Sequence, residues 1–223
     1  MTAEITIQRP APTRWQRFAS MMRRALHAEL RVYSSIGRAI ARRPAVPRGG
    51  TGIGYHRPTL TVLIVFIVLS AVEIPIIDLI VHRWPAVRIG FLILGIWGLT
   101  WMIGLLCAML MRPHAVAPDG IVIRGGLEVD VAIPWSAVAS VAIRKRIDEP
   151  KQPRVTERPD GWEYAERVLH ETNILIELEQ PHPVRLPGLP PRGGEQLVTS
   201  VRIWADDPRA FLDAARPFLL AAD

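Results

Sequence analysis

The sequence predicts an α+β membrane protein with a two-helix transmembrane hairpin, an N-terminal amphipathic helix, and a small antiparallel β-barrel or bent sheet capped by a C-terminal helix. Three observations predict this organisation. Two predominantly apolar runs of 23 residues lie close together, at residues 59–81 and 89–111. Apolar residues recur at helical spacing between residues 14 and 43. From residue 112 onward, short runs alternate apolar and polar residues, which is typical of half-buried strands.

The two apolar runs have the length of membrane spans. A helix needs about 20 residues to cross the hydrocarbon core at about 1.5 Å per residue. The first run begins nearly sixty residues into the chain, and both are longer than the apolar part of a signal peptide. Residues 82–88 are just long enough to join the spans as a hairpin.

Charge is distributed unevenly along the chain. Residues 1–58 carry eleven arginines against Glu4 and Glu29, a net charge of +9, whereas residues 112–223 carry fourteen basic against seventeen acidic residues, a net charge of −3. The basic segment adjoins the first span, so the high pI indicates an anionic leaflet rather than a nucleic acid as its partner. The positive-inside rule then predicts a plasma (cytoplasmic) membrane protein with two spans and both termini in the cytoplasm.

The basic N-terminal segment divides into a tail predicted to be disordered, residues 1–13, and a predicted amphipathic helix, residues 14–43. The apolar residues of the helix fall within about 60° of one line at about 100° per residue. The opposite side carries an arginine ridge, which consists of Arg17, Arg24, Arg31, Arg38 and Arg42. This pattern predicts a helix lying among lipid headgroups, with each ridge arginine worth about 1 kcal/mol near an anionic leaflet. The alternative is a helix docked on the C-terminal domain or on a partner, with a solvated ridge.

Residues 44–58 form a Pro/Gly-rich linker that we interpret as a hinge. Its GGTGIG run lacks the Gly-Lys-Ser/Thr of a P-loop, and no predicted strand precedes it.

Polar residues within the predicted spans are expected to have a partner, because inserting a charged Asp at mid-depth of the bilayer costs about 2.5–3.5 kcal/mol. Asp78 lies three residues from the outer end of its span and shares a helix face with His82, which could pair with it. Glu73 lies deeper, at the same depth as Trp97 of the second span. We expect Glu73 to bond the Trp97 indole or another subunit. A proton or ion pathway is the alternative, and it would require an oligomer.

Residues 112–223 are predicted to form one domain. We expect a β-hairpin over residues 120–133 with its turn near Gly125, and further strands at residues 138–147, 173–180 and 197–205. Residues 148–161 are predicted to be a charged, mobile loop, and residues 162–170 fit either a strand or a helix. Asp206 or Asp207 is expected to cap a last helix that Pro217 kinks or ends.

Several stretches of this domain resemble the bacterial PH-like domains of membrane-anchored proteins. They are RPHAVAPDGIVIRGG with DVAIPWSAVASV, then TNILIELEQPHPVRL, and the ending IWADDPRAFLDAARPF. The resemblance covers about residues 112–220 and implies a seven-stranded bent barrel, capped by a helix, that contacts lipid or protein. The basic loop with which eukaryotic PH domains bind phosphoinositides is absent, since the turn is only RGGLE. The basic run Arg144, Lys145 and Arg146 is better explained as a solvated strand end than as a headgroup site.

No catalytic motif is present. The chain has no GxSxG, HExxH, Walker A or CxxC sequence, and its single cysteine, Cys107, lies within the second span. The six histidines are scattered, match no metal-ligand spacing and are expected on the surface. We therefore expect no enzyme activity, no cofactor and no metal.

The sequence favours a non-catalytic integral membrane protein that presents a PH-like interaction or scaffold domain at the cytoplasmic face. A protein partner or a second copy is expected to bind through the transmembrane hairpin. Two alternatives remain: a small subunit or regulator of a transport system that uses Glu73 and Asp78, and a module that senses anionic lipid.

Overall fold

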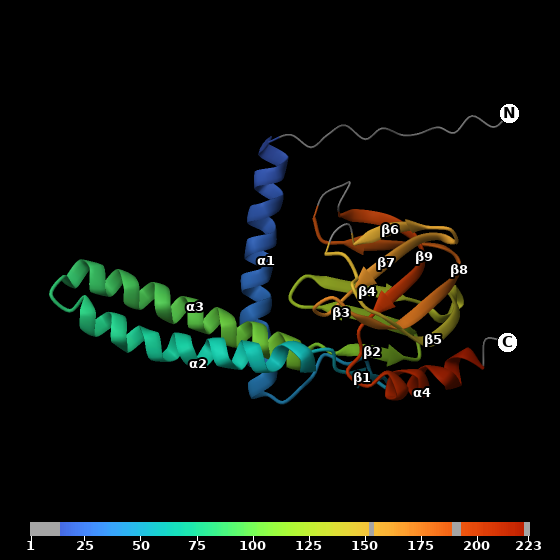
Figure 1. Cartoon of the computed structure of the whole chain (residues 1–223), viewed down its shortest axis with the longest axis horizontal. Coiled ribbons are helices and arrows are strands. Elements are labelled where there is room, and N and C mark those ends of the chain that lie inside the picture. Colours follow the sequence, from blue (N-terminus) through green and yellow to red (C-terminus); the bar gives the residue numbers. More distant parts are fainter. Residues whose placement is uncertain (1–13, 152–153, 189–192, 221–223) are drawn as a thin grey trace.

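The computed structural model describes residues 14–151, 154–188 and 193–220. The tail predicted to be disordered, residues 1–13, lies outside the described residues. A long helical hairpin extends from one side of a two-sheet domain, and a third long helix, α1, crosses the hairpin where it meets the domain (Figure 1). The molecule is therefore α+β, with helices and sheets in separate layers.

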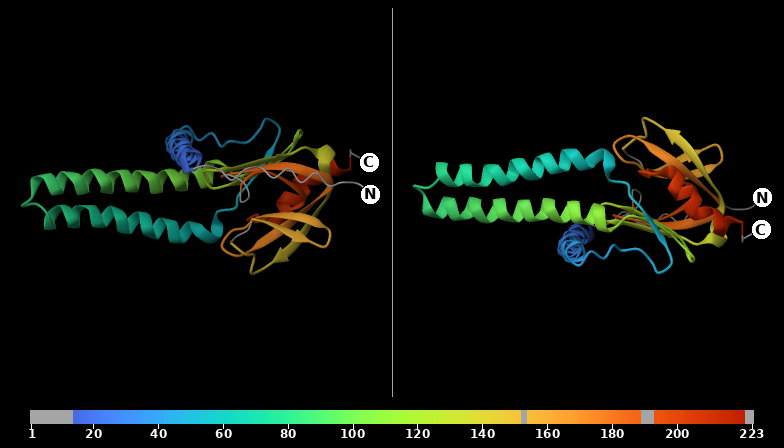
Figure 2. Two further views of the ribbon diagram at one scale, coloured as in Figure 1. Left: turned by 90° about the horizontal axis from the view of Figure 1, so that it is seen from above. Right: turned by 90° about the horizontal axis from the view of Figure 1, so that it is seen from below.

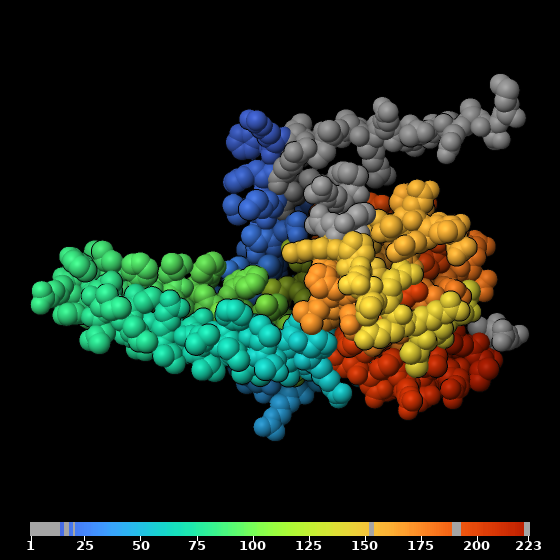
Figure 3. Space-filling model, viewed as in Figure 1, coloured from blue at the N-terminus to red at the C-terminus, as the bar shows by residue number. Residues whose placement is uncertain are grey.

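The hairpin consists of α2 (Arg57–Ile80) and α3 (Pro85–Met111), which pack side by side (Figure 2). Both helices are long and apolar enough to cross a membrane, as predicted, and their bounds agree with the sequence to within a few residues. No residue of α2 is buried, and only Gly104 and Ala108 are buried in α3. The hairpin therefore stands out from the domain with its apolar surface uncovered (Figure 3).

Helix α1 (Arg14–Ile40) crosses the C-terminal end of α3 (Figures 1 and 2). The crossing is close because Gly104 has no side chain: an added Cβ would lie 2.2 Å from Cγ1 of the fully buried Val32. Gly95 permits a similar approach of α2, since its Cβ would lie 2.9 Å from Ile74. Gly95 thus allows α2 to pack closely against α3, and Gly104 allows α1 to do the same.

In the described part of the chain, nine strands form two sheets. The first has the order β1 (Thr51–Ile53), β2 (His114–Ala117), β3 (Gly120–Gly125), β4 (Val129–Ile133). The second has the order β5 (Val138–Arg146), β8 (Thr172–Leu186), β9 (Gly194–Ile203), β7 (Gly161–Glu166), β6 (Val155–Arg158). All pairs are antiparallel except β7 with β9. Within the described residues no strand pair joins the two sheets, so the domain is not a closed barrel.

The core lies between the two sheets and is closed by the last helix, α4 (Pro208–Leu219). Isoleucines and valines from both sheets alternate inward, and α4 adds Phe211 and Ala215, both fully buried. Trp135, in a 3₁₀ turn (Trp135–Ala137), stacks on Phe218 with ring centroids 5.1 Å apart. Asp207 caps α4 by accepting a 2.9 Å hydrogen bond from the Ala210 amide. Pro217 lies inside α4, which continues to Leu219.

Two segments differ most from their predicted structure, and β8 also continues to Leu186, beyond the strand expected at residues 173–180. The expected hinge at residues 44–58 contains β1, which pairs with β2 through Thr51 opposite Val116, and it buries Ile53 and Tyr55. The expected loop at residues 148–161 contains β6, and the ambiguous residues after it contain β7. In both cases tertiary strand pairing overrides a weak local signal.

Candidate functional site

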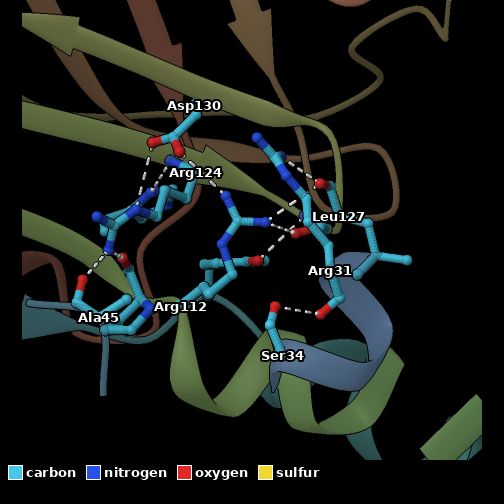
Figure 4. A network of polar contacts seen from close by, with 11 residues as sticks. Arg31, Ser34, Ala45, Arg112, Arg124, Leu127 and Asp130 are labelled. Carbon is cyan, nitrogen blue, oxygen red and sulfur yellow. Dashed lines mark hydrogen bonds and ion pairs between the residues drawn. The ribbon is translucent and has the colours of Figure 1, made fainter. Parts of the chain in front are cut away.

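Helix α1, the end of α3 and the β3–β4 region of the first sheet meet where the helices join the domain (Figure 4). Arg112, directly after α3, donates to the Gly126 and Leu127 carbonyls, each at 3.2 Å, and to Asp130 Oδ2 at 3.2 Å. Burial lowers the pKa of Arg112, and the nearby charge of Arg31 adds to this effect. Helix α3 is thus followed directly by a side chain that bonds the β3–β4 turn.

Arg124 of β3 bonds the segment that follows α1 to this junction. Its guanidinium donates to the Ala45 carbonyl, to the Pro113 carbonyl at 3.1 Å and to Asp130 Oδ1 at 3.4 Å. Asp130 therefore accepts from two arginines, and its side chain stays 43% exposed. The junction carries more positive charge than Asp130 neutralises.

The arginine ridge of α1 reaches this junction. Arg24 makes a two-pronged ion pair with Glu128, with distances of 3.1 and 2.6 Å, and Arg31 donates to the Leu127 carbonyl. Helix α1 is therefore docked on the domain, and these two ridge arginines have partners within the chain. Arg38 and Arg42 are exposed, whereas the side chain of Arg17 lies outside the described part of the structure.

The apolar side of α1 stays uncovered. Its exposed side chains are Trp15, Phe18, Met22, Leu26, Leu30, Tyr33 and Ile40. At about 100° per residue this stripe lies opposite Arg24 and Arg31. Because those arginines face the domain, the stripe faces the side from which the hairpin extends (Figure 1).

Asp206 connects the N-terminus of α2 to the domain. Its carboxylate accepts hydrogen bonds from the amides of His56 at 3.0 Å and Arg57 at 3.1 Å, at the N-terminus of α2. The side chain is only 5% exposed, and Trp204 Nε1 donates to it at 3.3 Å. A negative group at this end is stabilised by the helix dipole and satisfies free amides. The sequence offered Asp206 as one of two caps for α4, but it caps α2 instead.

His114 holds the centre of the junction, and the expectation that it lies on the surface is wrong. It is 1% exposed, its Nδ1 accepts from the Arg124 amide at 3.0 Å, and its Nε2 lies 3.0 Å from the Trp204 carbonyl. Burial lowers the pKa of His114 to about 4. The imidazole is therefore neutral and fully hydrogen-bonded, and its ring packs on Tyr55 at 4.8 Å.

A small cavity of about 200 Å³ lies between the hairpin helices and the domain, next to His114 and Tyr55. Glu166 also lines it and accepts from Tyr164 Oη at 2.5 Å. Burial raises the pKa of Glu166, although Arg154 at 3.2 Å opposes the shift. Each polar group of the cavity named here already has a partner, so the arrangement is that of a packed joint.

In the hairpin, the polar residues separate into two environments. Asp78 accepts hydrogen bonds from the Arg88 guanidinium at 2.5 and 2.8 Å, near the turn between α2 and α3. The expected pairing of Asp78 with His82 is therefore wrong. Nδ1 of His82 lies 2.7 Å from the Leu79 carbonyl oxygen instead. Glu73 and Trp97 line a groove of about 570 Å³ between α2 and α3. Glu73 is exposed in this groove and makes no hydrogen bond or ion pair with another described residue, so the expected bond to the Trp97 indole is not formed.

The outer face of the five-stranded sheet carries a polar hollow of about 730 Å³. At its floor Glu163 is held by Arg202 at 2.9 Å, by Arg158 at 3.1 Å and by Arg146. Burial alone would raise the pKa of Glu163, but the bonds from Arg146 and Arg202 outweigh burial and hold it below its usual value. Arg146, expected at a solvated strand end, is thus part of an ion-pair cluster.

Comparison of the chain with known protein families, with curated proteins and with solved structures found no match. The argument for function therefore depends on the junction, the uncovered apolar surfaces and the hollow on the outer sheet.

Proposed function

We propose that the chain is a non-catalytic integral membrane protein that holds its two-sheet domain, a PH-like interaction or scaffold module, in a fixed orientation at the cytoplasmic face of the plasma membrane. The observation that carries this proposal is the junction. Arg112, directly after α3, and Asp206, at the N-terminus of α2, each bond one helix of the hairpin to the domain. A flexible tether would need neither bond, whereas a platform that presents one face needs both.

The position of α1 supports a membrane at the hairpin. Between Pro85 and the crossing at Gly104, α3 provides about 19 residues, or roughly 28 Å at about 1.5 Å per residue. This length is close to the hydrocarbon thickness of about 30 Å. Helix α1 would then lie at the bilayer surface, with its apolar stripe toward lipid and Arg24 and Arg31 toward the domain. The docked and the interfacial interpretations of this helix are thus compatible.

The hollow on the outer sheet is the surface we propose for a protein partner. It faces away from the core, and its walls include Arg144, Glu177 and Glu179, which suit a polar partner segment. We would place a photo-crosslinking amino acid at Glu177 in the full-length protein and irradiate native membranes. The matched control position is Asp213, exposed on α4 of the same domain.

We expect one crosslinked product of defined mass at Glu177, no such product at Asp213, and loss of the product when Arg144→Glu reverses a charge in the hollow. Equal products at both positions, or no product at Glu177, would remove the hollow as the interaction surface.

A second candidate function, a small subunit or regulator of a transport system, is supported by the groove at Glu73. An unpaired carboxyl group in an apolar groove is costly unless another helix or an ion binds it. Replacing Glu73 with Gln should then abolish ion flux through the purified assembly while its size on gel filtration is unchanged. An unchanged flux would exclude this role, and a change in assembly size alone would make Glu73 an oligomer contact.

A further inference from the structure

One face of α1 forms one wall of a cleft of about 450 Å³, and the opposite wall comes from the domain. Arg23, Arg24, His27 and Arg31 line the first wall and fall within about 100° of the helix circumference. The second wall contains Glu128, from the β3–β4 turn, and Arg185, near the end of β8. Two elements that are far apart in sequence thus direct basic side chains into one space.

The charges in this cleft do not balance. Glu128 is its one carboxylate among the described lining residues, and both of its oxygens are occupied by Arg24. Arg23 and Arg185 are exposed and make no hydrogen bond or ion pair with another described residue. Four guanidinium groups around one paired carboxylate leave a strong positive potential, which favours an anion between the walls.

We propose that this cleft binds a phosphate group through Arg23, Arg31 and Arg185. A guanidinium is a planar fork of N–H donors that matches phosphate oxygens in pairs, and such charge-assisted bonds are short and strong. A site that draws donors from α1 and from β8 would also be completed only when α1 is docked, so phosphate binding would stabilise the docked position of α1.

Two sources could supply the phosphate. The cleft adjoins α1, whose apolar stripe faces the hairpin side, so an anionic phospholipid headgroup could enter from the leaflet; this source depends on the proposed membrane position. A soluble phosphate ester could enter from water, and that source does not depend on the proposed membrane position. The chemistry at the arginines is the same in both cases.

The test uses full-length protein in phosphatidylcholine nanodiscs and two probes, dioctanoyl phosphatidylglycerol and glycerol 3-phosphate, titrated by calorimetry. The cleft variant is Arg23→Gln with Arg185→Gln. The control variant is Arg38→Gln with Arg43→Gln, which removes the same charge from exposed positions outside the cleft. Thermal unfolding of each variant verifies that its fold is intact.

We expect saturable binding of at least one probe by the wild type, a Kd at least about tenfold weaker in the cleft variant, and less than about threefold weakening in the control. Binding of the lipid probe alone identifies a headgroup as the source, and binding of both identifies a soluble phosphate ester as a competent ligand. Equal weakening in the two variants, or no saturable binding of either probe, would overturn the proposal. Because glycerol 3-phosphate needs no bilayer, its result is independent of the membrane assignment.

Discussion

Hydrogen bonds made by two charged side chains connect the hairpin helices to the domain. Arg112 bonds the end of α3 to the β3–β4 turn, and Asp206 bonds the start of α2 to the segment between β9 and α4. Both are partly or fully shielded from water, where hydrogen bonds to charged groups contribute about 1.5–3 kcal/mol. A few residues therefore determine how the domain is oriented.

His114 gives this junction a pH dependence. Its pKa is about 4 when folded, against 6.5 for an unperturbed histidine, so the unfolded chain binds the proton more readily. The stability contributed by neutral His114 is complete above pH 6.5 and is lost as the pH falls toward 4, by on the order of 3 kcal/mol. Chemical unfolding of the full-length protein in micelles at pH 7 and pH 4.5 measures this loss.

The control for that measurement is His114→Gln, in which the side chain can still donate and accept hydrogen bonds but does not titrate. We expect the variant to be less stable than the wild type at pH 7 and to lose less stability between the two pH values. The same loss in both proteins would place the acid sensitivity elsewhere in the chain.

At the scale of elements, α1 has two faces with different roles. Its arginines and Val32 dock it on the domain and on α3, while its apolar stripe is uncovered. An apolar stripe of this length on a helix that is already docked needs a further contact, since large exposed apolar patches mark lipid or protein surfaces.

Replacing Gly104 with Leu should undock α1, because its Cβ alone would lie 2.2 Å from Val32. Overpacking of this kind costs about 1–3 kcal/mol. We expect amide hydrogen exchange in the α1 segment around Val32 to become at least about tenfold faster, measured by mass spectrometry on the full-length protein.

Gly98→Leu is the matched control on the same helix, since a Cβ at Gly98 meets nothing within 4 Å. Its α1 exchange should equal that of the wild type. Unchanged exchange in Gly104→Leu would show that α1 is not held at this crossing.

The sequence predicts some of these elements well and others not at all, for physical reasons. The spans, the amphipathic character of α1 and the β3–β4 hairpin depend on local composition and periodicity, so they are visible in a single chain. Strand β1 cannot be recognised from the sequence, because three residues in a Gly-rich run become a strand only through pairing with β2. The partner of Arg24 is 104 residues away, and both partners of His114 come from other strands or their ends, so no local pattern indicates them.

For the whole molecule, the arrangement is a hairpin, a crossing helix and a two-sheet domain joined at one place (Figure 1). If the hairpin spans a bilayer, the domain lies directly at its surface and α1 lies along that surface. The cleft between α1 and the domain is then at headgroup level, and the hollow on the outer sheet is open to solvent. The proposed platform function depends on which side of the membrane the domain occupies, whereas phosphate binding in the cleft depends on the membrane only if a lipid headgroup supplies the phosphate.

Cysteine accessibility tests this orientation most directly. In a Cys107→Ala background, single cysteines at Arg83, in the hairpin turn, and at Glu157, in β6, would be exposed to a membrane-impermeant maleimide in right-side-out and inside-out vesicles. Our account predicts labelling at position 83 only in right-side-out vesicles and at position 157 only in inside-out vesicles. Labelling of both positions from the same side would contradict a spanning hairpin, and the reversed pattern would place the domain outside the cytoplasm.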